Sequence, residues 1–362
     1  MARSKYHFEA EKGWINDPNG LIYFKGKHHL FFQYNPYDVK WGTMHWGHAV
    51  SDDLINWTHL PIALYPDKPY DTAYGCWSGS AVVKDDRLYL IYTACDEDFR
   101  QTQCIAYSDD GITFTKYENN PVIDHFPEDG SADFRDPKVF KIGDTYHMVL
   151  ASGKDGIGKI LRYTSKDLFN WDYAGVLFED RKFTEIAECP DFFELDGKYV
   201  LMYSLIIEGQ DEDRTAVAIG SFDGEKFVPE RVYRPEHGPH FYATQSFIDK
   251  DGERIVFAWT KRTTDKPVED EYMGALSAPR ELHVKDGKLI SYPIKALQPY
   301  LTDSDSHVRV CSDGVEILDN SGNVVMKSDL SDINDVKILR DTHCIEVFIN
   351  GGEESFLYWF DN

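Results

Sequence analysis

A segment that recurs five times along the chain constrains its fold more than any other feature. Residues 51–57 read Ser-Asp-Asp-Leu-Ile-Asn-Trp; similar segments begin at Ser108 and Ser165, and weaker copies begin at Ser221 and Ser277. Successive copies begin 56 or 57 residues apart. Each copy is a polar turn followed by an aromatic residue, as expected at the crossing between two outer strands. A constant period of this length indicates a repeat architecture.

A second pattern has the same period and marks one hairpin in each repeat. An apolar strand follows each of the turns at residues 25–27, 85–87, 143–145, 196–198 and 251–253. Another short strand precedes each turn, at residues 21–24, 81–83, 138–141, 192–195 and 246–248. Alternating Tyr, Phe, Val and Ile are typical of such strands, and about four strands fit each repeat. The sequence therefore predicts a five-bladed β-propeller; a large β-sandwich with accidental internal similarity is the alternative.

The repeats end near Leu297, and a different strand pattern follows. Further strands are expected at residues 308–311, 315–318, 324–326, 336–339, 344–349 and 356–360. We predict an all-β chain, with a propeller domain at 1–298 and a small, shortened C-terminal β-sandwich module at 299–362. About 60 residues form only a marginal core. We therefore expect the module to pack against the propeller, or against a second copy in a homo-oligomer.

The charge of the chain excludes some classes of partner. It has 62 acidic and 38 basic residues, a formal net charge of −24. Nucleic acids and anionic membrane surfaces need a cationic face, so neither is an expected partner. No run approaches the roughly 20 apolar residues of a membrane-spanning helix. The first residues include no apolar signal region, so a cytoplasmic location is expected. The charge does not exclude neutral ligands, and sugars are the obvious class of these.

The cysteine and histidine spacings do not indicate a metal site. The six cysteines include no C-x-x-C pair. They are too few for a disulfide framework in a chain of 362 residues, so reduced thiols are expected. His45 and His48 do not have the spacing of a zinc-protease motif. We expect no metal and no cofactor.

Three carboxylates occupy matching places in the repeats, just before the predicted first strands. They are Asp17, Asp136 and Glu188, and Arg135 adjoins the second. The first strand of every propeller blade lines the central channel, so matching positions converge at one end of it. We therefore expect the three carboxylates to share one funnel. The alternative is ordinary turn chemistry at the neighbouring prolines.

A carboxylate cluster without metal ligands suits cleavage of a glycosidic bond. One carboxyl group protonates the departing oxygen, and another attacks the anomeric carbon or activates water. Like charges that lie close together also raise the pKa of one group, which then serves as the acid.

Several motifs that contain these residues resemble glycoside hydrolase family 32, the invertase and fructosidase family. Trp-Ile-Asn-Asp-Pro-Asn-Gly at 14–20 resembles the family signature, and residues 134–137 and 188–191 resemble its second and third motifs. Further matching stretches are residues 31–36, 40–48 and 77–80. The resemblance covers about residues 5–300. It implies a five-bladed propeller followed by a β-sandwich, and residues 344–353 resemble the sandwich motif of the family, whose sandwich is usually longer.

The resemblance also implies roles for individual residues. Asp17 would be the nucleophile, and Glu188 the general acid and later the base that activates water. Asp136 would bind fructose hydroxyls and stabilise an oxocarbenium-like transition state. The fructosyl pocket would be shaped by Asn16, Gln33, Trp41, Ser78, Arg135, Tyr242 and Trp259. Cys189 would be a neighbour of Glu188.

The expected function is that of a retaining β-fructofuranosidase. It would hydrolyse the terminal β-fructosyl bond of sucrose, sucrose 6-phosphate or short fructo-oligosaccharides by double displacement. Lys261 and Arg262 are candidates to bind a phosphate, with ordinary surface charges as the alternative. Other activities stay open: a fructan-acting exo-fructosidase, a fructosyltransferase, an inverting glycosidase acting on arabinans, and a non-catalytic glycan-binding propeller.

Overall fold

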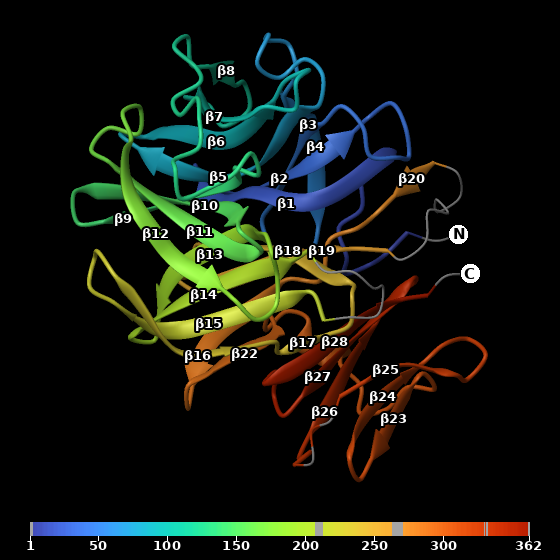
Figure 1. Cartoon of the computed structure of the whole chain (residues 1–362). Coiled ribbons are helices and arrows are strands. Elements are labelled where there is room, and N and C mark those ends of the chain that lie inside the picture. Colours follow the sequence, from blue (N-terminus) through green and yellow to red (C-terminus); the bar gives the residue numbers. More distant parts are fainter. Residues whose placement is uncertain (1–2, 207–212, 263–270, 329, 331, 361–362) are drawn as a thin grey trace.

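Strands make up nearly all of the regular structure. The computed structural model describes residues 3–206, 213–262, 271–328, 330 and 332–360. Among these residues the one helix is a short 3₁₀ helix, Gln298–Tyr300, and no helix is long and apolar enough to span a membrane. Five sheets form a ring, and two further sheets form a module at its edge (Figure 1). The predicted five-bladed propeller with a C-terminal β-sandwich is confirmed.

Each blade is one sheet whose four main strands follow the order of the chain. Blade one contains β1 (Gly13–Phe24), β2 (Lys27–Asn35), β3 (His45–Ser51) and β4 (Trp57–Leu64). Blade two contains β5 (Gly75–Lys84), β6 (Arg87–Cys95), β7 (Gln101–Ser108) and β8 (Thr115–Lys116). Blade three contains β9 (Arg135–Ile142), β10 (Thr145–Lys154), β11 (Ile157–Ser165) and β12 (Asp172–Asp180). Blade four contains β13 (Ala187–Leu195), β14 (Lys198–Leu205), β15 (Thr215–Phe222) and β16 (Phe227–Tyr233). Blade five contains β18 (Phe241–Ile248), β19 (Arg254–Thr260), β21 (Arg280–Lys285) and β22 (Lys288–Pro293).

The recurring polar segment forms one local structure, the turn between the third and fourth strands of a blade. Ser51 Oγ accepts the N–H groups of Asp53 at 3.1 Å and Leu54 at 2.9 Å. Asp53 Oδ1 accepts two more backbone N–H groups, and Leu54 adopts a φ of +67° with its side chain buried. Corresponding bonds occur in the copies that begin at residues 108 and 165. This self-contained hydrogen bonding explains why the segment recurs.

The prediction of a fifth such turn at Ser277 is wrong. The copy at Ser221 does lie between β15 and β16, but Ser277 precedes β21, the third strand of blade five. Its hydroxyl accepts the N–H of Ala258 at 3.0 Å instead of closing a turn. The long connection before β21 also contains β20 (Tyr272–Met273), which pairs in parallel with the start of β1. This pairing joins the last blade to the first.

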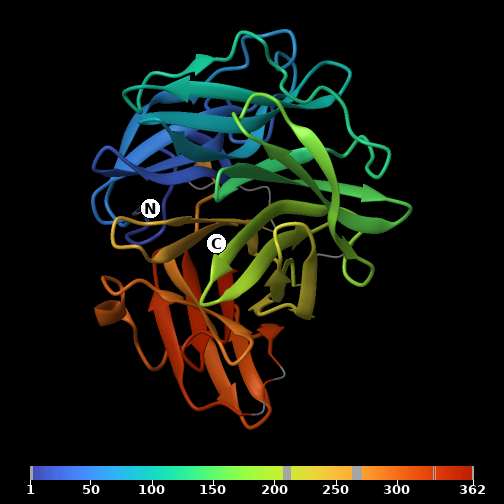
Figure 2. The same ribbon diagram turned by 90° about the vertical axis from the view of Figure 1, so that its left-hand side faces the viewer.

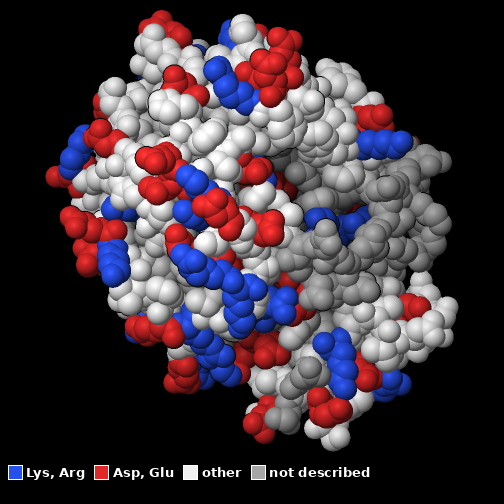
Figure 3. Space-filling view, viewed as in Figure 1, with Lys and Arg blue, Asp and Glu red and all other residues white. Residues whose placement is uncertain are grey.

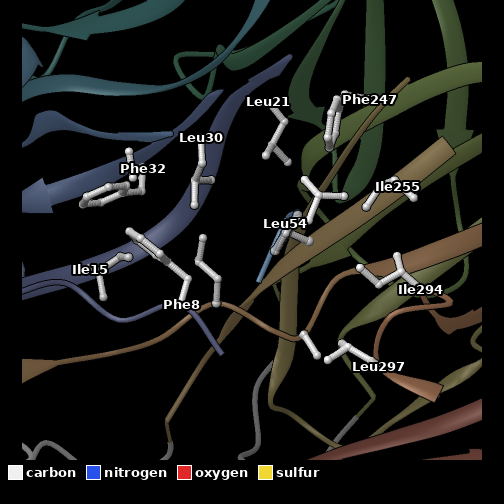
Figure 4. Packing of buried hydrophobic residues seen from close by; sticks show 14 of the residues in the cluster. Phe8, Ile15, Leu21, Leu30, Phe32, Leu54, Phe247, Ile255, Ile294 and Leu297 are labelled. Atoms are coloured by element: carbon white, nitrogen blue, oxygen red, sulfur yellow. The ribbon is translucent and has the colours of Figure 1, made fainter. Parts of the chain in front are cut away.

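The first strands of neighbouring blades contact one another around the ring: β1 with β5, β5 with β9, β9 with β13, β13 with β18, and β18 with β1. Apolar side chains fill the spaces between blades. Figure 4 shows one such cluster, in which Leu21 and Leu30 of blade one converge with Phe247 and Ile255 of blade five. Phe8, from the N-terminal segment, belongs to the same cluster. The packing fixes the relative positions of the first strands, and therefore the geometry of the channel that they line.

Two small sheets form the C-terminal module, which Figure 2 shows at one edge of the propeller. One contains β23 (Val308–Cys311), β24 (Gly314–Leu318) and β25 (Val324–Lys327). The other contains β26 (Val336–Arg340), β27 (Cys344–Ile349), β28 (Glu354–Trp359) and β17 (Glu236–His237). β17 comes from the connection between blades four and five and pairs in parallel with β28. We propose a division into a propeller, 1–298, and a module, 299–362, although β17 shows that the second sheet takes one strand from the first part.

A buried network of charged side chains connects the module to the propeller. The Arg280 guanidinium donates to Glu346 at 2.8 Å and to Glu236 at 2.7 Å. The two ring nitrogens of His7 lie 2.9 Å from Asp341 and 2.8 Å from Glu346. Buried charges are tolerated where each finds an opposite charge. We refer to these five residues as the interface network.

Charged side chains of both signs are interspersed over the face of the molecule in Figure 3. Many form pairs across a blade, such as Lys198 with Glu230 at 2.8 Å. All six cysteines are free thiols, and four of them are buried.

Candidate active site

A pocket of about 530 Å³ receives side chains from all five blades. The structure brings together in it every residue predicted for the site: Asn16, Asp17, Gln33, Trp41, Ser78, Arg135, Asp136, Glu188, Tyr242 and Trp259. It also contains Trp77, Phe99, Asp133, Ile206, Arg214 and Lys261, of which only Lys261 was singled out as a candidate ligand-binding residue from the sequence.

A β-bulge in the first strand of each blade turns these side chains toward the pocket. The pairing with the second strand shifts between Ile15 and Pro18, Cys76 and Gly79, Arg135 and Lys138, Glu188 and Asp191, and Tyr242 and Gln245. Each shift leaves two residues outside the ladder. Bulges bend a strand and redirect its side chains, and proline is tolerated there because no N–H is needed. The polar motifs therefore lie within strands that still pair on both sides of the bulge.

The expectation that the three carboxylates precede the first strands is wrong in this detail. Asp17 lies within β1, Asp136 within β9 and Glu188 within β13. Their positions in the bulge also differ: Asp17 is its second residue, Asp136 its first, and Glu188 directly precedes it. The repeat brings them to one place, and the local offset gives each carboxyl group different partners.

Asp17 is partly buried and held at both carboxylate oxygens. Asn16 Nδ2 donates to Oδ1 at 3.0 Å, and Ser78 Oγ donates to Oδ2 at 2.6 Å. Burial raises the pKa of Asp17; the hydrogen bonds from Ser78 and Asn16 oppose this effect, and the charge of Glu188 adds to it. The two donors therefore stabilise the ionised carboxylate and oppose the effect of burial on its pKa.

Asp136 is buried and lies at a strained backbone position, with a φ of +60°. Its Oδ2 accepts the N–H of Cys189 at 2.9 Å, and the Cys189 thiol lies 3.5 Å from the same oxygen. Burial raises the pKa of Asp136 to about 7; Arg135 opposes this shift, and the charges of Glu188 and Asp17 add to it. Cys189 also contacts Asp17 Oδ2 at 3.7 Å, so its thiol lies between the two aspartates.

Glu188 accepts hydrogen bonds at both carboxylate oxygens. Arg135 Nε and Nη2 donate to Oε1 at 3.0 and 2.9 Å, and the Tyr242 hydroxyl donates to Oε2. Arg135 Nη1 donates in turn to Asp133 at 2.7 Å. Although burial acts in the opposite direction, Glu188 and Asp136 raise the pKa of Arg135, which stays charged. This cation and the tyrosine fix the orientation of the Glu188 carboxyl group.

Side chains of blade two hold the segment of blade three that contains Arg135 and Asp136, and sequence reasoning missed them. Gln101 Oε1 accepts the N–H of Phe134 at 2.8 Å and Arg135 Nη1 at 3.2 Å. Thr93 Oγ1 accepts the N–H of Asp136 at 3.0 Å. Gln101 and Thr93 are both buried. A run of polar residues in an otherwise apolar strand, Gln-Thr-Gln at 101–103, was the available signal.

Aromatic rings form one rim of the pocket, on blades one and two. Trp41 and Phe99 are both about half exposed, at 46% and 47%. Trp77 lies between them, with its ring centroid 6.1 Å from that of Trp41 and 5.3 Å from that of Phe99. Half-exposed aromatic rings at a pocket mouth offer an apolar surface to a ligand.

The two basic residues predicted as phosphate ligands separate in the structure. Lys261 lines the pocket, with Nζ 4.3 Å from the ring centroid of Tyr242. Arg262 does not line the pocket; its guanidinium lies 5.4 Å from the ring centroid of Trp359 in the C-terminal module. Adjacent residues on an extended segment point in opposite directions.

One group of three side chains in the described part of the chain has a geometry that could hold a metal ion. Glu253, Glu281 and His283 place their ligand atoms within 4.8 Å of one another. None of them lines the pocket.

Comparisons with known proteins identify the family of the chain. Residues 7–293 match the family model "Glycosyl hydrolases family 32 N-terminal domain". The chain is 41% identical over 334 residues to the levanase of Bacillus subtilis, covering 82% of this chain and 47% of the levanase. It is 35% identical over 385 residues to a sucrose-6-phosphate hydrolase of Zymomonas mobilis, covering 98% of this chain and 74% of that protein. The chain thus spans about half of the one relative and about three quarters of the other.

Solved structures give the same result. The β-fructofuranosidase of Bombyx mori superposes with a TM-score of 0.87 at 32% identity, covering 99% of this chain and 89% of that one. The sucrose-6-phosphate hydrolase of Lactobacillus gasseri superposes with a TM-score of 0.84 at 26% identity, covering 99% and 88%. The motifs, the propeller and these matches together establish that the chain belongs to glycosyl hydrolase family 32.

Proposed function

We propose that this chain is a retaining β-fructofuranosidase that hydrolyses the terminal β-fructosyl bond of sucrose, sucrose 6-phosphate or short fructo-oligosaccharides by double displacement. The observation that carries the proposal is the convergence of Asp17, Asp136 and Glu188 in one pocket, each with different hydrogen-bond partners. The names of the relatives, levanase and sucrose-6-phosphate hydrolase, support a β-fructoside substrate.

In the first step Asp17 attacks the anomeric carbon of the fructosyl unit. The donors Asn16 and Ser78 stabilise its ionised carboxylate and orient it. Glu188 transfers a proton to the departing oxygen, so that the aglycone leaves as a neutral alcohol. A covalent fructosyl-enzyme results, with an ester bond to Asp17.

In the second step Glu188, now a carboxylate, removes a proton from water. The resulting hydroxide attacks the anomeric carbon and releases Asp17. Arg135 and Tyr242 hold Glu188 in place through both steps. A carboxylate that shuttles a proton needs fixed donors because reorientation between steps would slow each transfer.

Asp136 binds the hydroxyl groups of the fructosyl ring in this proposal. Because its pKa is about 7, both protonation states exist near neutral pH. It can therefore donate a hydrogen bond to one sugar oxygen or accept one from a hydroxyl. Gln33, whose amide donates to the carbonyl of Cys76 at 3.0 Å, lines the same pocket. Trp41 and Trp259 complete the walls.

The variant Asp17→Asn tests this assignment. The side chain keeps its size but loses the nucleophile, so release of reducing sugar from sucrose should fall by a factor on the order of a thousand or more. The matched control is Asp52→Asn, on an exposed turn of the same blade, where Asp52 pairs with Lys27 at 2.7 Å. If the Asp17 variant hydrolysed sucrose at the rate of the control, the assignment of the nucleophile would be refuted. If the unmodified chain bound sugar without hydrolysing it, a non-catalytic glycan-binding propeller would be favoured.

Product analysis separates the remaining alternatives. Nuclear magnetic resonance of the first product should detect the β-anomer of fructose, since two displacements retain configuration. An α-anomer would indicate an inverting enzyme. Oligosaccharides formed from concentrated sucrose would indicate a fructosyltransferase, and faster release from inulin or levan than from sucrose an exo-fructosidase. A cytoplasmic location and a homo-oligomer through the C-terminal module stay predictions, which cell fractionation and light scattering test.

A further inference from the structure

We propose that Lys138 and Asp191 are positioning residues for the proposed reaction, because their ion pair fixes Glu188 relative to blades three and five. This inference rests on the proposed function and adds residues that act from beneath the pocket. Neither Lys138 nor Asp191 lines the pocket itself. Each follows directly after the β-bulge of its strand, Lys138 in β9 and Asp191 in β13.

The residue that directly follows the bulge differs between the blades in a way that suits this role. It is Pro18 in β1 and Gly79 in β5, but Lys138 in β9, Asp191 in β13 and Gln245 in β18. Three blades therefore place a polar side chain at this level of the ring, and the other two place a proline or a glycine. Because the first strands surround one axis, these three side chains reach neighbouring blades beneath the bulges.

Lys138 and Asp191 join blades three, four and five to one another. The Lys138 ammonium lies 3.1 Å from Asp191 Oδ1 and donates to the carbonyl of Ser246, in β18, at 2.6 Å. Asp191 Oδ2 accepts the N–H of the same Ser246. Each pair among these three blades therefore shares a direct contact at this level.

Gln245 extends these contacts to the first two blades. Its Nε2 donates to the carbonyl of Gly79 in β5 at 2.8 Å. Its Oε1 accepts the N–H of Leu21 in β1 at 3.2 Å. Polar contacts beneath the bulges thus connect the inner strands of all five blades.

Blades three, four and five are joined a second time, inside the pocket. Arg135 of blade three and Tyr242 of blade five both donate to Glu188 of blade four. Cys189 of blade four donates its N–H to Asp136 of blade three. The bulge of β13 therefore lies between two sets of contacts with the same neighbours, and loss of the lower set leaves Glu188 held from one side only.

The two sets of contacts are closely packed. A cavity of only about 10 Å³, roughly the room of one water molecule, is lined by Asp136 and Cys189 on one side and by Lys138 and Gln245 on the other. The side chain of Lys138 is 12% exposed and that of Asp191 1%. In so dense an interior, a displacement of the ion pair passes to the pocket.

The chemical nature of the pair also favours a role in geometry. Burial lowers the pKa of Lys138, and the charge of Asp191 opposes this shift. A buried ion pair is often no more stable than apolar side chains of the same size. What the charged pair supplies in addition is directional bonding to the backbone of a third blade, at Ser246.

The other role open to the pair is to stabilise the fold alone. A pair with only that role changes the free energy of unfolding but leaves kcat of the folded chain unchanged. A positioning pair lowers kcat with little effect on KM, because the proton transfer by Glu188 occurs in the transition state. The informative quantities are therefore kcat and KM for sucrose, measured at a temperature at which each variant is folded.

Lys138→Met removes the ammonium group and keeps the length of the side chain. We expect kcat for sucrose to fall by about tenfold to a hundredfold, the effect of misplacing a reacting group by about 1 Å. KM should stay within about twofold. Fructosides with activated aryl leaving groups should lose less in the first step, because they need little protonation by Glu188.

Lys116→Met is the matched control. The Lys116 side chain is 8% exposed and pairs with the buried Asp71 at 2.5 Å, but it lies on β8, the outer strand of blade two, and does not line the pocket. This variant should lose stability, as Lys138→Met does, with kcat unchanged.

The double variant Lys138→Met, Asp191→Asn separates the two roles and carries the test alone if Lys138→Met does not fold. It removes both buried charges and keeps an acceptor for the N–H of Ser246. Recovered stability with kcat still low would support the positioning role. Recovery of kcat together with stability, or an unchanged kcat in a folded Lys138→Met, would overturn it. Failure of the unmodified chain to hydrolyse any β-fructoside would instead contradict the proposed function.

Discussion

The pocket and the interface network are both groups of buried or partly buried acidic side chains, but they differ in charge balance. Of the acidic side chains that line the pocket, Asp133 and Glu188 are hydrogen-bonded to Arg135. Asp17 and Asp136 instead accept hydrogen bonds from neutral donors, the side chains of Asn16 and Ser78 and the N–H of Cys189. In the network, Arg280 and His7 pair with Glu236, Glu346 and Asp341.

The pKa values follow this balance. In the pocket burial raises the pKa of Asp136 to about 7. In the network burial acts in the same direction, but Arg280 and then His7 hold the pKa of Glu346 below its ordinary value. The comparison teaches that burial raises the pKa of a carboxyl group where nearby cations do not balance its charge. Where cations do balance the charge, the same residue type joins two parts of the fold.

The largest expected effect is on the chemistry of the pocket. Glu188→Gln removes the proton donor, so kcat/KM for sucrose should fall by about a hundredfold to ten-thousandfold. Fructosides with activated aryl leaving groups should lose much less in the first step, since they need little protonation. An equal loss on both substrates would contradict the acid role. The free energy of unfolding should change little, because Arg135 keeps its hydrogen bond to Asp133.

The corresponding substitution in the interface network should act on stability. Arg280→Met leaves Glu236 buried without its cation and Glu346 with His7 alone, which should cost about 3–5 kcal/mol. Urea denaturation measures the change. The double variant Arg280→Met, Glu346→Gln is the control and should recover part of the loss. If Arg280→Met were as stable as the unmodified chain, Arg280 would not balance the buried charges of Glu236 and Glu346 as the structure indicates.

The two regions should also respond to pH with opposite signs. The pKa of Asp136 rises on folding from about 3.9 to about 7, so the folded chain binds the extra proton between these values. Its contribution to stability therefore falls as the pH rises through that range, by up to about 1.4 kcal/mol per unit. Asp136→Asn should remove this slope from the pH dependence of unfolding.

The pKa of Glu346 is lowered on folding, so the opposite dependence follows. The contribution of Glu346 to stability is present above its pKa in the unfolded chain, about 4.3. This contribution is lost as the pH falls through its pKa in the folded chain. The stability difference between the unmodified chain and Glu346→Gln should therefore be largest near neutral pH and shrink in acid. If the stability contributions of Asp136 and Glu346 changed with pH in the same direction, the contrast between the two regions would be contradicted.

The smallest expected effect concerns the support of the pocket by blade two. Gln101→Leu removes the acceptor that holds Arg135, and we expect kcat to fall about tenfold with a smaller change in KM. Gln101→Glu retains an acceptor oxygen and should recover most of kcat, with a shifted pH profile because it adds a charge beside Arg135. Loss of stability without any change in the pH profile or in kcat would indicate a purely structural role.

Local turn chemistry explains how much of the fold was predictable. The serine and aspartate side chains of residues 51–57 complete their own turn, so the pattern survives in other blades and reveals the period. The copy at Ser277 misled because its serine bonds to Ala258 in the neighbouring strand. β17 and β20 were missed, since each is two residues long and forms only by pairing with a distant strand.

The site was predictable where a motif carries it, and less so where tertiary packing does. The bulges could not be read from the sequence, because the register shift depends on the second strand as well as the first. The sequence also indicated nothing about which of Lys261 and Arg262 lines the pocket, which depends on the direction of the chain after β19. Gln101 and Thr93 act on a neighbouring blade, so their role appears only when the ring is closed.

The central claim, that Asp17 is the nucleophile in a double displacement, has one direct test. Glu188→Gln, supplied with an aryl β-fructoside, should form the fructosyl-enzyme quickly and hydrolyse it slowly, because the base for the second step is missing. Intact-mass spectrometry should then detect a chain carrying one fructosyl unit, and peptide mapping should place the unit on Asp17. An adduct on any other residue, or rapid turnover with no adduct at any time, would contradict the account.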